Sequence, residues 1–599
     1  MDWSSSYSVT DNIKIGFEAN NLLNEITKTS IQYNQDGATA PRSYFVSYRR
    51  LGLFVQATFS FVELFIVKSI DINNNHRADL SMTKNSGDRP RKIVILGGGT
   101  AGWMTAAALA HIVGEQMDSI TLIESEQIGT VGVGEATIPH LRYFNQRLGI
   151  DEHEFMRRTN ATYKSGIEFI NWGRKGDSYI HPFGDFGFKT EGVHFYHYWL
   201  RAQKNNHAHS LFDYSLPIVA ARQKRFDYPH SDQNSLLSTY SYAFHIDAAQ
   251  YAIFLREFCA EKVQRIEGKL QQVEQDLDYG DILGLVLEDG RRIVGDFFID
   301  CSGFRALLIE QTLASGFEDW SHWLACNRAF AVPTEKNGEP LPYTKATAQA
   351  AGWQWRIPLQ HRTGNGHVFA SEFISEDEAM TTLIDNLDAP MLAGVNSLKF
   401  TAGRRCKGWV KNCVAIGLSS GFLEPLESTS IYLIQASIMK LVELFPNGFE
   451  YSSQRIEYNR QLDMEYERIR DFLILHYHAT EREDTAFWRY CKNMSIPASL
   501  HEKIQAFKED AYVVRYDKGL FLLPSWIAVY IGQGIIPAHY HPAADQLSDA
   551  DLDASLDNLR ENILTAVERL PSHHEAIRKH AAEQLPWPTA AMSLYGVFS

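Results

Sequence analysis

The chain lacks several features that would place it in a common class. Its six cysteines are spread over 599 residues and none forms a CxxC pair, which argues against a zinc ribbon, a thioredoxin-type site or another metal centre. Scattered single cysteines fit a reducing compartment, so we expect a cytoplasmic protein. Positive charge is in deficit: the formal net charge is -15 at pH 7, which argues against nucleic acid as a partner.

Long apolar runs are also missing. The nearest candidate, Leu51 to Val67, is interrupted by Gln56 and Glu63 and is rich in aromatic and β-branched residues, which favours a strand over a membrane helix. The N-terminus has no basic region followed by an apolar stretch, so we predict no signal peptide. We expect no stable membrane insertion.

The first 81 residues differ in texture from the rest. SVTDNIKIGFEANNLLNE and RSYFVSYRRLGLFVQATFSF alternate polar and apolar residues as strands do, and a polar, turn-rich linker follows them. Residues 1–62 resemble the closing barrel strands of a TonB-dependent outer-membrane receptor, although so few strands cannot span a membrane alone. We interpret residues 1–81 as an appendage from a gene fusion or a start site assigned upstream of Met82. A small β-subdomain of its own is the alternative.

A dinucleotide-binding pattern begins at Lys92. The apolar run KIVIL predicts a buried parallel strand, and Gly97, Gly99 and Gly102 form GxGxxG at the start of an alanine-rich helix. A second strand, SITLIES, carries Glu124 about 20 residues beyond the last glycine, where a ribose hydroxyl needs an acceptor. This order predicts a nucleotide site that also includes Thr100 and Ala101.

Two later segments favour FAD over NAD as the cofactor. Gly295 to Phe304 and Cys413 to Tyr432 each read as an apolar strand followed by a turn of small residues. Strand ends distributed in this way are typical of two-domain flavoprotein monooxygenases. We therefore predict an α/β, Rossmann-like FAD-binding core with an inserted mixed β-sheet over residues 90–450, and a mainly helical substrate-binding or lid region over residues 451–599.

Seven motifs, taken in order, identify a family. They are GGGTAGW (97–103), VGVGEATIP (131–139), ATYKSGIEF (161–169), HPFG (181–184), FHIDA (244–248), GWQWRIP (352–358) and FLEPLESTSIY (422–432). From about residue 90 to residue 599 the chain resembles the flavin-dependent tryptophan halogenases. GWQWRIP is the most specific of the seven.

The resemblance implies a reaction. Reduced FAD, oxygen and chloride or bromide generate hypohalous acid, which passes through an internal tunnel to a catalytic lysine, matched here by Lys164. A lone lysine is more often a solvated surface charge, so this role depends on its motif. Glu427 matches the catalytic glutamate, which stabilises the cationic ring intermediate and helps to remove its proton.

Further site residues follow from the same resemblance. Thr429 and Ser430 match the halide site, although the family usually has glycine where Ser430 stands. The residues that match cofactor contacts are Glu135, Ala136, Leu270, Leu418 and Ile431.

The two tryptophans of GWQWRIP admit two readings. Side chains two apart in a strand share a face, so Trp353 and Trp355 can form one aromatic wall. The resemblance places this wall beside the flavin, where it keeps organic substrate and water from a reactive species while halide still approaches. The alternative is that both are ordinary core aromatics.

The substrate region matches the family only in part. His181 and Phe183 match the pair that sandwiches an indole ring, Ser428 lies next to the catalytic glutamate, and Trp526 could stack on an aromatic substrate. The lid region, Arg515 to Asp545, is more apolar than a zwitterion requires, and burying an unpaired charge is costly. We therefore expect an indole-type substrate rather than free tryptophan.

Alternative functions remain open at this point. A flavin-dependent aromatic hydroxylase of the same fold would not need the lysine, the tryptophan wall and the Glu-Ser-Thr turn together. A non-catalytic or membrane-associated protein is suggested only by the N-terminal strands. Because one dinucleotide fingerprint is evident, we expect a separate flavin reductase to supply reduced FAD, and we leave a homodimer open.

Overall fold

The chain divides into two compact units, Met1–Thr83 and Lys84–Ser599. The computed structural model describes residues 91–127, 134–206, 209–514, 516 and 519–582, together with the backbone of five strands in the first unit. Met82, the linker expected around it, residues 131–133 of the VGVGEATIP motif and Arg515 lie outside the described residues.

The first unit contains one sheet of five short strands, in the order β1-β2-β3-β5-β4. Neighbouring strands run antiparallel except β3 and β5, which are parallel. Strands occur in both segments whose alternation predicts them. Their bounds are β1 Trp3–Thr10, β2 Ile13–Ala19, β3 Lys28–Tyr33, β4 Ser43–Ser47 and β5 Phe54–Thr58.

A six-stranded sheet, in the order β13-β7-β6-β17-β26-β25, carries the nucleotide-binding pattern of the second unit. Its strands run parallel except β25, which is antiparallel to β26. The run KIVIL forms β6 and is buried beyond its first residue, as expected of a parallel strand covered on both faces. The bounds are β6 Lys92–Leu96, β7 Ser119–Glu124, β13 Gln264–Glu267, β17 Phe297–Asp300, β25 Trp409–Val410 and β26 Cys413–Ala415.

A glycine turn joins β6 to α1 (Thr100–Ala108). Gly97 has a φ of +114°, and a Cβ there would lie 2.2 Å from the carbonyl oxygen of Cys301. A Cβ on Gly102 would lie 1.8 Å from the carbonyl oxygen of Gly97. These two glycines allow strand, turn and helix to approach closely, whereas a Cβ on Gly99 would meet open space.

The second large sheet is mixed, as predicted. Its order is β11-β10-β20-β21-β22-β19-β23, and only β10 and β20 run parallel. The α/β fold class is therefore confirmed. The bounds are β10 Gly166–Ile170, β11 Ser178–Pro182, β19 Arg328–Thr334, β20 Thr344–Gln349, β21 Gly352–Pro358, β22 Thr363–Phe369 and β23 Asn396–Lys399.

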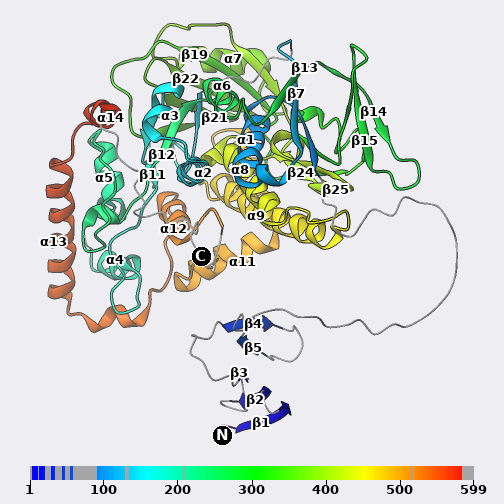
Figure 1. Cartoon of the computed structure of the whole chain (residues 1–599). Helices are drawn as coiled ribbons and strands as arrows, with labels where there is room; N and C mark the ends of the chain where they lie inside the picture. The colour runs from blue at the N-terminus through cyan, green and yellow to red at the C-terminus, as the bar shows by residue number, and fades with distance from the viewer. Residues whose placement is uncertain are drawn as a thin grey trace. The chain divides into compact units, whose positions relative to one another are not determined.

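Three smaller sheets, β8-β12-β9, β14-β15-β16 and β18-β24-β27, have three strands each. The hairpin of β14 and β15 projects from the rest of the second unit (Figure 1). The bounds are β8 Gly134–Ala136, β9 Thr162–Lys164, β12 Ala243–Asp247, β14 Leu270–Gln275, β15 Ile282–Leu287, β16 Arg292–Val294, β18 Phe317–Asp319, β24 Gly403–Arg405 and β27 Gly421–Phe422.

Helices between the strands cover the parallel sheet and connect the two large sheets. Helix α1 packs against α6 and α8, and α8 packs in turn against the long α9. The bounds are α2 His140–Leu148, α3 Glu152–Thr159, α4 Phe195–Lys204, α5 Leu216–Arg222, α6 Ala248–Phe258, α7 Glu376–Asp385 and α8 Thr429–Glu443.

The C-terminal part of the described chain is helical. Helix α13 runs alongside α4 and α5 (Figure 1), and α14 packs on α3 and β9. Among the residues that the structure describes, no helix combines the length and hydropathy needed to cross a bilayer. The bounds are α9 Ser452–His478, α10 Ala486–Asn493, α11 Ala498–Asp510, α12 Leu523–Gly532, α13 Asp549–Glu568 and α14 His573–Ala582.

The glycine turn gives a matched pair of stability predictions. Gly97→Ala forces a side chain into a left-handed conformation against the Cys301 carbonyl, so we expect it to lower the free energy of unfolding by about 1–3 kcal/mol or more. Gly99→Ala introduces the same methyl group where space is open and φ is -74°, so it should change stability by less than about 0.5 kcal/mol. Thermal unfolding of both variants compares them, and equal melting temperatures would contradict this account.

Candidate functional site

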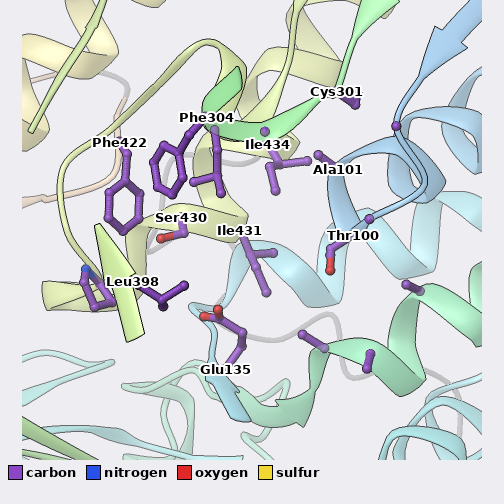
Figure 2. Close-up of a pocket in the computed structure, with 18 of the residues that line it drawn as sticks. Thr100, Ala101, Glu135, Cys301, Phe304, Leu398, Phe422, Ser430, Ile431 and Ile434 are labelled. Atoms are coloured by element: carbon purple, nitrogen blue, oxygen red, sulfur yellow. The ribbon is translucent and has the colours of Figure 1, made fainter. Parts of the chain in front are cut away.

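One cavity of about 600 Å³ extends from the glycine turn to the start of α8. Figure 2 shows Thr100 and Ala101 at one side of it, Glu135 at another, and Ser430, Ile431 and Phe422 opposite. Most of the residues that the sequence assigns to cofactor and halide lie on its wall. They are Gly97, Gly99, Thr100, Ala101, Glu124, Glu135, Ala136, Leu270, Leu418, Ser430 and Ile431.

Other predicted residues lie next to this cavity or behind its wall. Trp353, Trp355, Glu427 and Ser428 also line it. Gly102 packs α1 against the glycine turn instead. The remaining predicted residues are buried outside the set that lines the cavity: Lys164, His181, Phe183, Thr429 and Trp526.

The glycine end of the cavity has the features of a site for the pyrophosphate of a dinucleotide. Gly99, the N-cap residue of α1, has no neighbouring atom where a Cβ would stand, so backbone can approach a pyrophosphate closely at the helix N-terminus. Glu124 ends β7 beside the turn, as predicted. Its carboxylate accepts hydrogen bonds from the Trp103 indole N–H at 3.1 Å and from Arg265, which fix its position at the cavity wall.

Glu135 stands on β8 at the wall of the same cavity (Figure 2). Burial raises the pKa of Glu135 to about 7. Ionised and neutral forms of this carboxyl group therefore coexist near neutral pH, so its charge at the cofactor cavity depends on what binds there.

The two tryptophans of β21 stand side by side on the cavity wall. Trp353 and Trp355 are buried, and their ring centroids lie 6.1 Å apart. Gly366 on the paired strand β22 makes room for this wall, because a Cβ there would lie 2.1 Å from the Trp355 ring. The tryptophans thus share one face, as the spacing predicts, and that face borders the cavity.

Behind the wall lies a buried carboxyl group that the sequence did not single out. Glu424 accepts a hydrogen bond from the Tyr477 hydroxyl at 2.8 Å. Burial raises the pKa of Glu424 to about 8, despite the opposing effects of Tyr477 and the Trp353 indole. Glu424 is therefore largely neutral at pH 7, and no buried negative charge lies behind the tryptophans at this point.

Lys164 ends the short strand β9 and is fully buried. Its Nζ donates to the carbonyl oxygen of Thr137 and to the hydroxyl of Ser428, both at 2.8 Å, and lies 5.1 Å from the centroid of the Phe183 ring. Burial lowers the pKa of Lys164 to about 7, although the Glu427 carboxylate acts in the opposite direction. Because Lys164 bonds to Ser428 and Ser428 lines the cavity, the Ser428 side chain lies between the ammonium group and the cavity.

A strained turn between β27 and α8 presents the groups that face Lys164. Glu424, Glu427 and Ser428 adopt φ angles of +72°, +63° and +60°, in a region that non-glycine residues rarely occupy. Each such residue costs about 1–3 kcal/mol and persists only where the surroundings hold it. Here the hydrogen bonds of Tyr477 to Glu424 and of Lys164 to Ser428 contribute to holding the turn.

Glu427 is buried between two histidines. His181 Nδ1 lies 2.8 Å from both carboxylate oxygens, and His476 Nε2 lies 2.9 Å from Oε1. Burial alone would raise the pKa of Glu427, but His181 and His476 outweigh it and hold the value at about 2. Glu427 is therefore a buried anion at the wall of the cavity.

His476 was missed by sequence reasoning. Its Nδ1 must donate to the carbonyl oxygen of Phe472 at 2.8 Å, and its Nε2 faces the ionised Glu427. Both partners accept hydrogen bonds only, so the imidazole donates from both nitrogens and carries a positive charge. No local signal could identify it, because 49 residues separate it from Glu427 in the sequence.

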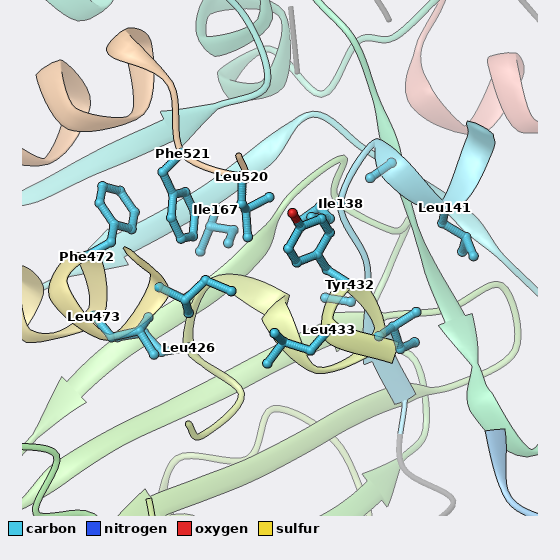
Figure 3. Close-up of a cluster of buried hydrophobic side chains, with 14 of the residues drawn as sticks. Ile138, Leu141, Ile167, Leu426, Tyr432, Leu433, Phe472, Leu473, Leu520 and Phe521 are labelled. Atoms are coloured by element: carbon cyan, nitrogen blue, oxygen red, sulfur yellow. The ribbon is translucent and has the colours of Figure 1, made fainter. Parts of the chain in front are cut away.

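An apolar, aromatic region packs against His181 and His476, the partners of Glu427, and Figure 3 shows Phe472 and Phe521 in it. Phe472 and Phe521 stack with their centroids 3.8 Å apart, and the His181 ring lies 5.8 Å from Phe472. Trp526 packs edge-on against Phe472 at 5.1 Å and donates its indole N–H to the Phe521 carbonyl oxygen at 3.2 Å. The two phenylalanines, which sequence reasoning missed, therefore separate Trp526 from His181.

Thr429 and Ser430 begin α8. Ser430 lines the cavity, and in Figure 2 its hydroxyl points to the side of Phe422 and away from Ile431. Thr429 is buried and is not part of the cavity wall. Only one of the two predicted halide residues thus presents its side chain to the cavity.

Comparisons with known proteins agree with this geometry. A protein-family model described as tryptophan halogenase matches residues 92–549. The chain belongs to the tryptophan halogenase family. Xcc4156, a flavin-dependent halogenase from Xanthomonas campestris, is 49% identical, with a TM-score of 0.79 over 82% of this chain and 99% of its own.

Two further relatives support the same assignment. BrvH, a flavin-dependent halogenase from Brevundimonas sp. BAL3, is 44% identical, with a TM-score of 0.79 over 82% of this halogenase and 99% of its own chain. Tryptophan 6-halogenase SttH from Streptomyces toxytricini is 36% identical over 518 residues, which is 81% of this chain and 97% of SttH. The protein is a flavin-dependent halogenase, and the hydroxylase alternative is not favoured.

One resemblance drawn from the sequence is not supported. Residues 1–62 were expected to resemble the closing strands of a TonB-dependent receptor. The family match of this halogenase begins only at residue 92, and the relatives named above are halogenases.

The histidine pair around Glu427 predicts a change in pH dependence. His476→Leu removes a positive charge and a hydrogen bond from the carboxylate, so the pKa of Glu427 should rise from about 2 and halogenation should fail at a higher pH on the acid side. Steady-state halogenation rates measured across pH test this. His478→Leu, on the same helix but bonded to the Cys491 carbonyl, is the control. An unchanged acid limb in His476→Leu would refute the assigned role of the pair.

Proposed function

We propose that this halogenase uses reduced FAD, O₂ and chloride or bromide to halogenate an indole-type aromatic substrate. The observation that carries the proposal is the buried Lys164. Its ammonium group touches Ser428 at the wall of the cofactor cavity, which Glu427 also lines, and its Nζ lies 5.1 Å from the centroid of the buried Phe183 ring. A charge-bearing group in such a place costs stability, which indicates a functional role.

FAD fits the cavity better than a smaller nucleotide does. The glycine turn and the α1 N-terminus suit its pyrophosphate, and the cavity continues past Glu135 and Ala136 to Leu418, Ser430 and Ile431. When bound, reduced FAD supplies the two electrons with which O₂ and halide become hypohalous acid and water. Leu270, the first residue of β14 in the projecting hairpin, lines the cavity, and we assign it to the nucleotide end.

The tryptophan wall keeps water and organic substrate away from the place where hypohalous acid forms. Trp353 and Trp355 present apolar rings to the cavity, and the neutral Glu424 behind them adds no charge that would draw water in. We propose that halide binds at the start of α8, where the backbone amides of Thr429 and Ser430 are available. The family resemblance implies a glycine where Ser430 stands, and we propose that the hydroxyl of Ser430 narrows the halide site.

Lys164 then receives hypohalous acid and passes the halogen to the substrate. A pKa of about 7 keeps both the ammonium and the free amine populated at neutral pH. The ammonium can donate a hydrogen bond to hypohalous acid, and the amine can be halogenated at nitrogen. Both routes place the electrophilic halogen at the same point, beside Ser428.

Glu427 completes the reaction on the ring. Addition of the halogen gives a cationic ring, which a nearby carboxylate stabilises before it accepts the departing proton. His181 and His476 keep Glu427 ionised for this step. The Phe183 ring, close to the Lys164 ammonium, contributes to the apolar wall on which the substrate ring would rest.

The aromatic region favours simple indoles over free tryptophan. Helix α12, LPSWIAVYIG, carries no charged side chain. Lys503, 5.3 Å from the Trp526 ring, is already paired with Asp471 at 2.7 Å and is not available to a substrate carboxylate. A free amino acid would therefore bury an ammonium and a carboxylate without matched partners, which is costly. We infer an indole, or an indole within a larger molecule.

We further propose a separate flavin reductase as the source of reduced FAD, because only one dinucleotide fingerprint is found in the sequence. The six unpaired cysteines fit a reducing compartment, and we propose the cytoplasm.

The experiment supplies indole and free tryptophan together to the full chain with FAD, a flavin reductase, NADH and chloride or bromide, and analyses products by mass spectrometry. We expect halogenated indole in excess over halogenated tryptophan, and no product when the reductase is omitted. Lys164→Ala should bind FAD normally but lose product by about 100-fold or more, because it lacks the group that delivers the halogen.

Three outcomes would count against parts of this proposal. Halogenated tryptophan in excess would overturn the substrate assignment alone. Turnover without reductase would overturn the partner. A Lys164→Ala variant with most of its activity, or hydroxylated products, would overturn the mechanism.

A further inference from the structure

Strand β9, which carries Lys164, is short and pairs with β12 along one of its two edges. No strand pairs with its other edge in the part of the chain that the structure describes. Thr162, Tyr163 and Lys164 lie opposite His245, Phe244 and Ala243 of β12. The Phe244 N–H donates to the Thr137 hydroxyl at 3.0 Å, and the Phe244 carbonyl oxygen accepts from the Thr137 N–H at 2.8 Å. Both backbone groups of Phe244 therefore face away from β9. In an antiparallel pair the residue opposite is then also turned away, so the Tyr163 N–H points to the open edge of β9.

A side chain from the last described helix closes that edge. The Tyr163 N–H donates to His573 Nε2 at 3.2 Å, and His573 Nδ1 donates to the carbonyl oxygen of Pro340 at 2.8 Å. Two residues further on, the Ser165 N–H donates to the Pro342 carbonyl oxygen at 2.7 Å. The buried His573 thus bridges β9 and the segment 340–342, as a neighbouring strand would.

These two contacts define the state of the ring. One nitrogen has to donate and the other has to accept, which requires neutral imidazole protonated at Nδ1. Burial lowers the pKa of His573 to about 4, in agreement with this requirement.

Helix α14 also reaches the Tyr163 side chain. The hydroxyls of Tyr163 and Tyr228 lie 3.0 Å apart, and Tyr228 donates to Glu152 at 2.9 Å. The ring of His580 lies 3.8 Å from that of Tyr228 and bonds to Asp227 at 3.0 Å. The Tyr163 backbone, one residue before Lys164, is therefore held by His573 of α14, and its hydroxyl is held by Tyr228, on which His580 of α14 packs.

We propose that His573 is a positioning residue for Lys164: by holding the Tyr163 backbone it aims the ammonium at the Thr137 carbonyl and the Ser428 hydroxyl. The inference rests on the proposed function of Lys164. His573 does not line the cofactor cavity, so its loss should leave flavin chemistry intact while hypohalous acid is no longer captured. The expected defect is uncoupling, not loss of the cofactor.

The test measures halogenated indole formed per reduced flavin oxidised, together with hypohalous acid trapped by a diketone reporter in solution. In His573→Phe we expect the product ratio to fall roughly 10-fold to 100-fold, as for a catalytic group displaced by about 1 Å, and the reporter to collect the missing halogen. Flavin affinity and the rate of flavin oxidation should match those of the wild type. His574→Phe, the same change at the next residue, should couple normally.

Two further variants separate positioning from general damage. The amide of His573→Gln can reach Tyr163 and should restore most of the coupling. That of His573→Asn is one methylene shorter, stops near the Nδ1 position and should not, which isolates the contact even if the phenylalanine variant is unstable. The pH dependence of the remaining coupling should also shift, because burial and the distance to Glu427 set the pKa of Lys164, and both change when the amine is displaced.

Several results would overturn the inference. Normal coupling in His573→Phe or His573→Asn would do so. A loss of coupling that is proportional to the loss of folded protein or of flavin binding, with an unchanged pH profile, would also overturn it, because that pattern marks a purely structural role. If Lys164→Ala couples like the wild type, the proposed function falls together with the positioning role. If Lys164→Ala is uncoupled and the His573 variants are not, only the positioning role falls.

Discussion

The site depends on one constraint, the burial of the Lys164 amine away from water. Two hydrogen bonds, to the Thr137 carbonyl and the Ser428 hydroxyl, replace its hydration shell, and the Glu427 carboxylate offsets part of the cost. The balance leaves its pKa near 7, so a proton enters or leaves easily at neutral pH. A solvated lysine, with a pKa of about 10.4, could not alternate in this way at neutral pH.

The turn that precedes α8 provides the groups that surround Lys164. The turn that carries Glu427 and Ser428 is in an unfavourable backbone conformation, yet only this shape lets one residue face the histidines and the next face Lys164. His181 and His476 keep Glu427 anionic, whereas the neighbouring Glu424, without a cationic partner in its contacts, is largely neutral. Two carboxyl groups three residues apart thus carry different charges because their partners differ.

Much of the cofactor site could be predicted from the sequence, because its signals are local. Gly97 and Gly102 are required by close backbone approach, and Trp353 and Trp355 share a face because strand side chains repeat every two residues. The partners of Lys164 and Glu427, the proposed catalytic groups, could not be predicted in the same way. His476 reaches Glu427 from a long helix, and His573 reaches Tyr163 across 410 residues of sequence, so only the tertiary fold brings them together.

The most direct test is to measure the pKa of Lys164 itself. Lysine side chains labelled with ¹³C at Cε can be titrated by NMR in the full chain, and Lys164→Met identifies the signal of interest by its loss. A single lysine signal that titrates near pH 7, absent from the variant, is the result that this account predicts. If the Lys164 signal titrates with the others at about 10.4, the amine is solvated, and a buried lysine that links flavin chemistry to the aromatic ring is contradicted.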